Sequence, residues 1–133
     1  MNRRKQKQYI EKPFYGLTKK MMDSKAWAEL DSYDKEAFLH IAIKCYGEEN
    51  KRDLSLTYEE AGKLGQSTHR FNKSIGNLVD YGFIDIIRSG GVWKRCNIYG
   101  ISERWRGYGS NNFKEGERVV HDPNFNPMAL SEN

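Results

Sequence analysis

The chain of 133 residues contains few of the groups on which metal or nucleophilic chemistry depends. Its three histidines, His40, His69 and His121, are widely spaced, and none forms an HxH or HExxH pattern or a metal-ligand spacing with cysteine or aspartate. The sequence also lacks a phosphate-binding loop of the GxxxxGK[ST] type. Because the sequence offers no recognisable catalytic residue, metal ligand or cofactor site, we predict that the protein is not an enzyme.

Cysteines and long apolar runs are also scarce. The two cysteines, Cys45 and Cys96, lack CxxC spacing, and we interpret them as reduced, packed thiols rather than a structural disulfide. No apolar run approaches the ~20 residues that a membrane span needs. The basic N-terminus is not followed by the apolar segment of a secretory signal. We therefore expect a cytoplasmic protein without a membrane partner.

Positive charge is concentrated at the N-terminus. The chain has a net charge of +4, whereas its first 20 residues carry seven basic residues and one acidic residue, so the remainder is net negative. The hydrophobic fraction of 38% and the length indicate one globular domain with a real core. We divide the chain into a basic flexible arm over residues 1–13, a folded domain over 14–107 and a polar C-terminal extension over 108–133.

The stretch over residues 54–87 has the order of a helix-turn-helix that runs into a β-hairpin. Thr57 and Ser67 are the expected N-caps of the two helices, and Thr57 opens a TxxE capping-box pattern. Gly65 and Gly82 tolerate the left-handed conformation with which helices commonly end. The predicted elements are a short strand over 54–56, helices over 58–64 and 68–81, and strands over 83–87 and 92–101 around a Gly90-Gly91 turn.

Further helical segments precede this stretch. The sequence predicts a short helix from Thr18 to Ser24, a segment over 25–30, a helix over 33–46 with Asp31 or Ser32 as N-cap and Gly47 as C′, and a last turn over 102–106. In the helix over 33–46, the apolar residues keep helical spacing, so we expect one face of it to be buried. The fold class we predict is α+β, a winged helix-turn-helix with a three-helix core and a two-stranded β-hairpin as its wing.

The helix over 68–81 has two unlike faces. Phe71, Ile75, Leu78 and Val79 lie at i, i+4, i+7 and i+8 and define a buried stripe. Outside this stripe, the start of the helix offers donors, acceptors and positive charge for reading base edges. The candidate DNA contacts are Ser67, Thr68, His69, Arg70, Asn72 and Lys73. The alternative is the solvated face that any surface helix has.

Two other basic groups are candidates for contacts with phosphates or a minor groove. They are Arg88, Lys94 and Arg95 in the predicted wing, and Arg3, Arg4, Lys5 and Lys7 in the arm. For the wing, the alternative is that charges protect an edge strand from pairing with other chains. For the arm, the alternative is a solubilising tail. As a set, the arm is expected to add salt-dependent affinity for nucleic acid.

These elements resemble the winged-helix domain of phage replisome organisers and plasmid replication initiators. The resemblance covers about residues 14–108, and its most specific part is the helix-end-to-wing junction LVDYGFI over 78–84. The other matching pieces are Phe14-Tyr15, residues 22–30 with Trp27, residues 33–47, LSLTYEEAGKLG, STHRFNKSIGNLVDYGFI and SERW. The resemblance implies DNA contacts from Thr68, His69, Asn72 and Lys73. We expect the chain to differ from full-length initiators in having no second folded domain.

Together these features predict a sequence-specific double-stranded DNA-binding protein of a mobile element, acting in replication initiation or control. Transcriptional regulation is the alternative within the same class. A protein-interaction module built on a winged helix is the alternative from another class. The expected partner is duplex DNA, with a second copy of the chain or a replication protein as a further candidate partner.

Overall fold

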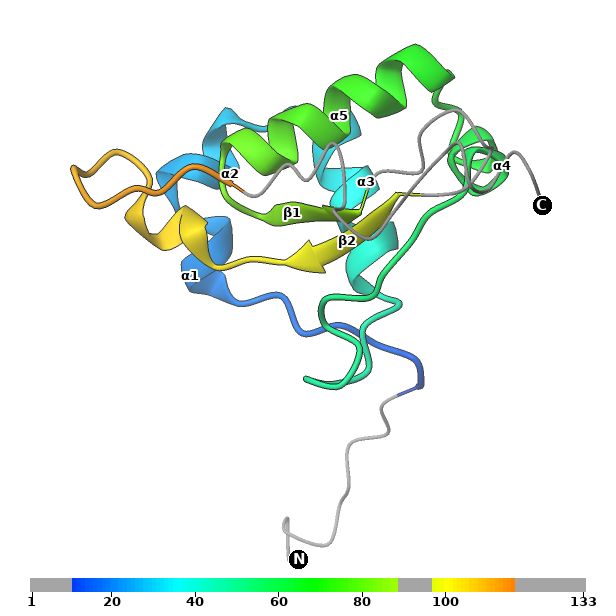
Figure 1. Cartoon of the computed structure of the whole chain (residues 1–133), viewed down its shortest axis with the longest axis horizontal. Helices are drawn as coiled ribbons and strands as arrows, with labels where there is room; N and C mark the ends of the chain where they lie inside the picture. Colours follow the sequence, from blue (N-terminus) through cyan, green and yellow to red (C-terminus); the bar gives the residue numbers. More distant parts are fainter. Residues whose placement is uncertain (1–10, 89–96, 117–133) are drawn as a thin grey trace, which may run out of the picture.

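The computed structural model describes residues 11–88 and 97–116, and these form an α+β fold (Figure 1). The described residues contain five α-helices, one 3-10 helix and a two-stranded antiparallel sheet, an order compatible with a winged helix. The elements are α1 (Lys19–Met22), α2 (Lys25–Glu29), α3 (Ser32–Ala42), α4 (Tyr58–Lys63), α5 (Thr68–Asp80), β1 (Ile84–Arg88), β2 (Ile98–Ile101) and the 3-10 helix η2 (Arg104–Gly107).

The helix starts are those that the capping residues predict. Thr18 and Ser67 each accept a hydrogen bond from the backbone N–H three residues on, and Ser24 does the same, so that α2 restarts after α1. Asp31 is the N-cap of α3, and Thr57 caps α4 in a complete capping box. These bonds satisfy backbone N–H groups that have no partner inside their helix.

The predicted end of the third helix is wrong. α3 ends at Ala42 rather than at residue 46, and Gly47 is not its C′ residue. The chain after α3 is held by Asn50, whose side chain accepts from the Tyr46 backbone N–H and donates to the Lys44 carbonyl. A side chain from the following loop therefore satisfies two backbone groups just beyond the end of the helix.

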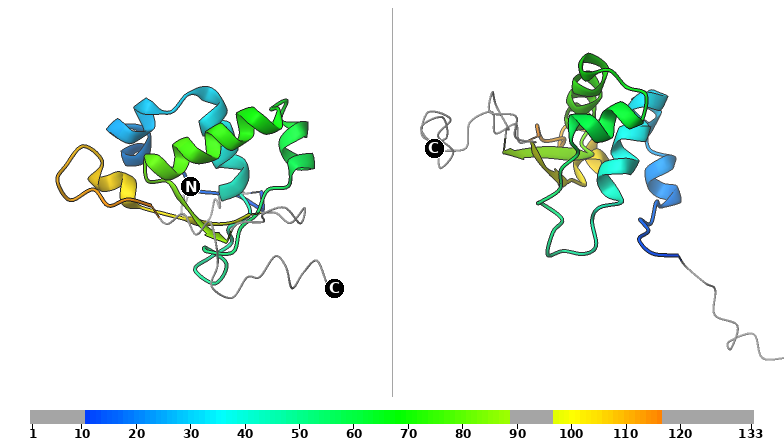
Figure 2. Two further views of the ribbon diagram at one scale, coloured as in Figure 1. Left: turned by 45° about the horizontal axis from the view of Figure 1, so that its top comes forward. Right: turned by 90° about the vertical axis from the view of Figure 1, so that its right-hand side faces the viewer.

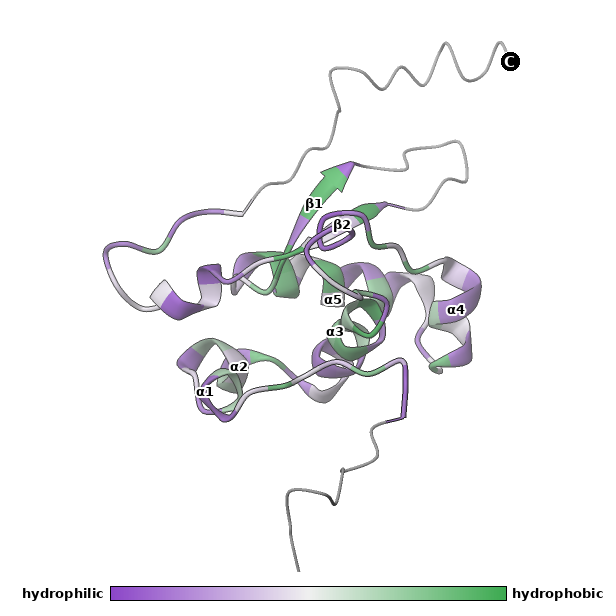
Figure 3. Ribbon diagram, turned by 90° about the horizontal axis from the view of Figure 1, so that it is seen from below, coloured by the Kyte–Doolittle hydropathy of each residue, from purple (hydrophilic) through white to green (hydrophobic). Residues whose placement is uncertain are grey.

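The core forms where α3, α5 and the hairpin meet. Phe38 of α3 lies edge-on to Trp27 of α2 and to Phe83, and Phe83 stacks on Trp105 of η2. The predicted stripe of α5 is confirmed, because Phe71, Ile75, Leu78 and Val79 are all buried. In the hydropathy view α4 is mostly hydrophilic, in agreement with its single buried residue (Figure 3). α4 is therefore a surface helix attached to the edge of the core.

The hairpin lies beneath α5, with α3 alongside (Figure 2). β1 pairs antiparallel with β2 from Ile84 opposite Ile101 to Arg88 opposite Ile98, with a register shift between Ile86 and Arg88. Leu54 adds an isolated bridge to Tyr99 of β2, where the sequence predicts a short strand. The predicted Gly90-Gly91 turn and the first part of the return strand lie outside the described residues. The described part of the sheet supports the C-terminal half of α5.

The junction between α5 and β1 is closed by the segment that follows β2. Gly82 has φ +93°, and a Cβ there would lie 2.4 Å from the Trp105 backbone nitrogen, so only glycine fits. The Arg104 guanidinium donates to the carbonyls of Val79 and Ile84 and pairs with Asp85. It also donates to the Lys114 carbonyl, so part of the predicted extension packs on the domain.

Candidate nucleic-acid interface

The start of α5 presents a polar face to solvent. Thr68, His69, Asn72 and Lys73 are exposed and occupy the first two turns of the helix. In the described part of the chain, Thr68, His69 and Lys73 make no side-chain hydrogen bond or ion pair, whereas Asn72 meets the hydroxyl of Tyr58. Ser67 is committed locally, because its Oγ accepts from the Arg70 backbone N–H. Four of the six predicted recognition residues thus share one outward surface.

Arg70 is oriented differently from the other predicted contacts. Its Nη2 donates to Asp31 Oδ2 at 2.6 Å and to Asp34 Oδ1 at 2.7 Å, and its guanidinium lies 4.9 Å from the Tyr33 ring. The Arg70 side chain is 20% exposed and that of Asp34 only 2%. The structure therefore places Arg70 between α5 and the N-terminus of α3, and not on the outward face.

The two aspartates complete a network that holds α5 against α3. Asp34 also accepts from the Asn77 side-chain amide, and Asp31 and Asp34 form the reciprocal capping box of α3. Burial alone raises the pKa of the Asp31 carboxyl, but the Asp34 backbone N–H and Arg70 outweigh it and lower that pKa below its ordinary value. The ion pairs of Arg70, the capping box of α3 and the packing of α5 on α3 therefore meet at this one network.

The neighbouring helix α4 is anchored equally firmly at its start. Lys44 donates to both carboxylate oxygens of Glu60 and to the Ser55 carbonyl. This bond from Lys44, followed by the Thr57 backbone N–H, lowers the pKa of the Glu60 carboxyl. The Tyr58 ring meets Phe71 edge-on at 6.2 Å, which sets α4 beside the start of α5. Tyr58, which no sequence pattern marked as a candidate contact, therefore borders the outward face.

The charge of α5's outward face changes along the helix. Lys73 lies in the second turn, whereas Asp80 ends the helix and is also exposed. The backbone N–H groups of the first turn give the helix N-terminus a partial positive charge, and the C-terminus carries the opposite sign. The N-terminal half is therefore the half suited to a polyanion.

The remaining predicted contacts are only partly within the described chain. Arg88 ends β1 and is half-buried, opposite Ile98 of β2. Lys94 and Arg95 of the wing, and Arg3, Arg4, Lys5 and Lys7 of the arm, lie outside the described residues. The first described residues, from Glu11 on, lie on the side of the domain opposite α5 (Figure 1).

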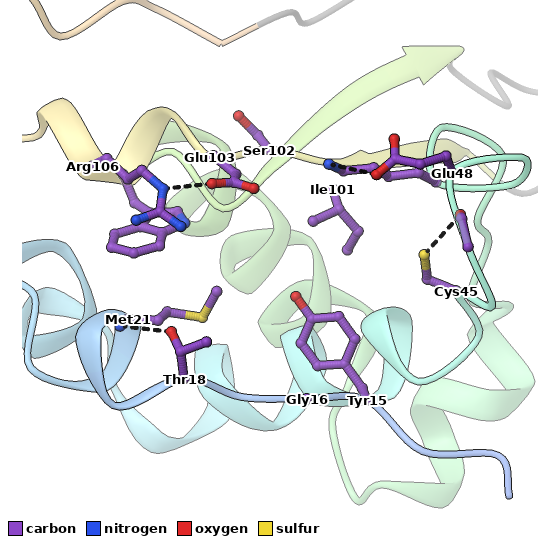
Figure 4. Close-up of a pocket in the computed structure, with 13 residues that line it drawn as sticks. Tyr15, Gly16, Thr18, Met21, Cys45, Glu48, Ile101, Ser102, Glu103 and Arg106 are labelled. Atoms are coloured by element: carbon purple, nitrogen blue, oxygen red, sulfur yellow. Dashed lines mark hydrogen bonds and ion pairs between the residues drawn. The ribbon is translucent and has the colours of Figure 1, made fainter.

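A cavity of about 410 Å³ opens at another place, between the segment before α1, the loop after α3 and η2 (Figure 4). Six of its lining residues are Tyr15, Met21, Cys45, Ile101, Glu103 and Arg106. Burial, followed by Cys45 and Glu103, raises the pKa of the Tyr15 hydroxyl, and a hydrogen bond from Arg106 lowers that of Glu103.

The cavity shows no pairing of a nucleophile with a base. Cys45 Sγ donates to the Gly47 carbonyl at 3.5 Å, and no histidine lines the cavity. Among the described residues, no three histidine, cysteine, aspartate or glutamate side chains gather as a metal would require. Among the charged residues that line the cavity, Glu103 pairs with Arg106 and Glu48 pairs with Lys51. Its chemistry is that of an amphipathic surface recess.

Comparison with protein-family models, with curated proteins and with solved structures finds no match to the chain. Among the described residues, no helix has the length and apolar character to cross a membrane. The geometry of α4 and α5 is therefore the basis on which function is inferred.

Proposed function

We propose that the protein is a winged helix-turn-helix that binds double-stranded DNA, with the N-terminal half of α5 in the major groove. The observation that carries this proposal is the separation of polar side chains at the start of α5. Arg70 turns inward to acidic partners, whereas Thr68, His69, Asn72 and Lys73 remain exposed on one surface. A major groove admits a helix, and amide, hydroxyl and ammonium groups read its base edges.

The way α5 is held supports the same proposal. Its buried stripe packs on the core, and Arg70 fixes its start to the capping box of α3. Recognition needs side chains presented from a rigid element, because loose side chains lose entropy on binding. In this arrangement the hairpin cations and the N-terminal arm supply the sequence-independent contacts with phosphates.

The biological setting we propose is a phage, plasmid or integrative element, in replication initiation or control. It follows from the resemblance of residues 14–108 to the winged helices of replisome organisers and initiators. Transcriptional regulation uses the same DNA contacts. Selection of bound sites from a random duplex pool distinguishes them, because a palindromic site is typical of a dimeric regulator and direct repeats are typical of an origin.

A protein-interaction module is the second candidate, and one observation favours it. Because Arg70 is paired internally, Lys73 is the cation of α5's described outward face, and Asp80 offsets its charge. The salt dependence of binding separates the two functions. Duplex binding weakens steeply as salt rises, with a slope set by the number of phosphates contacted.

The variant Asn72→Ala/Lys73→Ala tests the DNA proposal on a duplex selected from the random pool. We expect loss of preference for the selected site over a scrambled duplex, because each good base contact is worth about 1–3 kcal/mol of discrimination. The matched control is Lys20→Ala, which removes an exposed lysine from α1. Circular dichroism and the melting temperature check that the fold is kept. Unchanged preference in the double variant, or a failure to enrich any duplex, would contradict the proposal.

A further inference from the structure

A contact between α4 and α5 bears on how a base is read. The Tyr58 hydroxyl donates to Asn72 Oδ1 at 3.5 Å. We propose that Tyr58 is a positioning residue that holds the Asn72 carboxamide in the orientation that recognises adenine. The inference rests on the proposed function, since it requires α5 to lie in a major groove.

The position of Tyr58 is determined by contacts on either side of it. The preceding residue, Thr57, is the N-cap of α4 and forms a reciprocal capping box with Glu60. Each carboxylate oxygen of Glu60 also accepts a hydrogen bond from Lys44, at 2.8 and 2.7 Å. The first turn of α4 is therefore fixed to the turn that follows α3. Tyr58 occupies the first helical position of this turn and projects from a rigid base.

The Tyr58 ring is held from the other side by α5. It meets the ring of Phe71 edge-on at 6.2 Å, and Phe71 is almost fully buried. Tyr58 itself is 57% exposed, so its hydroxyl lies at the protein surface although its ring is supported. The next residue of α5 after Phe71 is Asn72. The tyrosine is thereby placed where it meets the only carboxamide among the four outward side chains.

The hydrogen-bonding groups of the Asn72 carboxamide explain why its orientation matters for reading a base. An asparagine recognises adenine by donating from Nδ2 to N7 and accepting at Oδ1 from the N6 amino group. The carbonyl oxygen has two lone pairs, so Oδ1 can accept from Tyr58 and still accept from adenine. A carboxamide turned by half a rotation presents the opposite order of donor and acceptor. With the phenol donating to Oδ1, a hydrogen of Nδ2 remains for adenine N7 and a lone pair of Oδ1 remains for the N6 amino group, so the observed orientation is one that can read adenine.

The test uses Tyr58→Phe, which keeps the ring and its packing on Phe71. The full chain and each variant are titrated with the duplex selected from a random pool and with duplexes changed at single positions. Asn72→Ala locates the base pair that Asn72 reads. At that pair we expect adenine, and in Tyr58→Phe we expect its preference over the other bases to fall about three- to tenfold, the range of one net hydrogen bond. Affinity for the non-adenine duplexes should stay the same.

The matched control is Tyr46→Phe, which removes a hydroxyl from an exposed tyrosine beyond the end of α3. Three outcomes overturn the inference while duplex binding stands: a base other than adenine at the Asn72 position, an unchanged adenine preference in Tyr58→Phe, or an equal loss of affinity for every duplex. The last result, with a smaller salt dependence, would identify Tyr58 as a phosphate contact. If no duplex is enriched, the proposed function itself fails.

Discussion

Replacing Arg70 by alanine removes the cation that connects α5 to α3. The guanidinium is shared by Asp31 and Asp34, with Nη2 2.6 and 2.7 Å from their carboxylates. Asp34 is buried and keeps two other donors after the change, the Asn77 amide and the Asp31 backbone N–H. The variant therefore leaves a buried carboxylate with hydrogen bonds and without a countercharge.

The size of the effect follows from this burial. Removing one partner of a buried ion pair costs about 3–5 kcal/mol, because the remaining charge stays out of water. The Arg70 side chain is 20% exposed and two donors to Asp34 remain, so we expect the low end, about 3 kcal/mol. With a urea m-value of about 1.5 kcal/mol/M, the midpoint of unfolding falls by about 2 M.

Tryptophan fluorescence during urea unfolding measures this shift, since Trp27 and Trp105 are buried in the core. The control is Lys73→Ala, an exposed change three residues further along α5, which should stay within about 0.5 kcal/mol. Adding Asp34→Asn to Arg70→Ala should recover part of the loss, because the buried group is then neutral. An Arg70→Ala midpoint equal to that of Lys73→Ala would refute the ion-pair network.

Two further predictions concern backbone and pH. The first is a glycine-to-alanine series followed by thermal unfolding. Gly62→Ala, in the open α4 helix, should stabilise the protein by about 0.5–1 kcal/mol, whereas Gly65→Ala should destabilise it by about 1 kcal/mol through left-handed backbone strain. Gly82→Ala adds a backbone clash to the same strain and should destabilise the protein most, so equal losses for Gly65→Ala and Gly82→Ala would contradict the clash. The lowered pKa of Glu60 implies stability present above its unfolded pKa and lost as pH falls through the lower folded value. Melting temperatures from pH 7 to 3 should therefore fall less for Glu60→Gln than for the parent and for Glu59→Gln, and identical profiles would exclude Glu60.

The local signals in the sequence predict the helix starts and the α5 stripe correctly. Thr57 and Ser67 cap the helices that they were expected to cap, and Gly65 and Gly82 have positive φ. Each of these features depends on residues within one or two helical turns, so it can be predicted from spacing alone. The α+β class follows from the same elements. The DNA contacts themselves stay predictions.

The features that the sequence did not predict depend on side-chain contacts made by loops and between separate elements. The Asn50 side chain binds the Lys44 carbonyl just beyond the early end of α3, and Arg104 binds the Lys114 carbonyl at the start of the extension. Tyr58 borders the outward face because α4 packs against Phe71. No periodicity encodes such contacts, since they arise only when the elements meet.

Arg70 best separates what the sequence alone determined from what the tertiary structure decided. Helical spacing established that Phe71 faces the core and that Asn72 and Lys73 face away, because about 100° per residue divides an amphipathic helix into two sides. Arg70 lies on the flank between these sides, where a long side chain can turn either way. Its direction is decided by Asp34, 36 residues earlier, because the buried carboxylate accepts a charge-assisted hydrogen bond from the guanidinium and needs a countercharge.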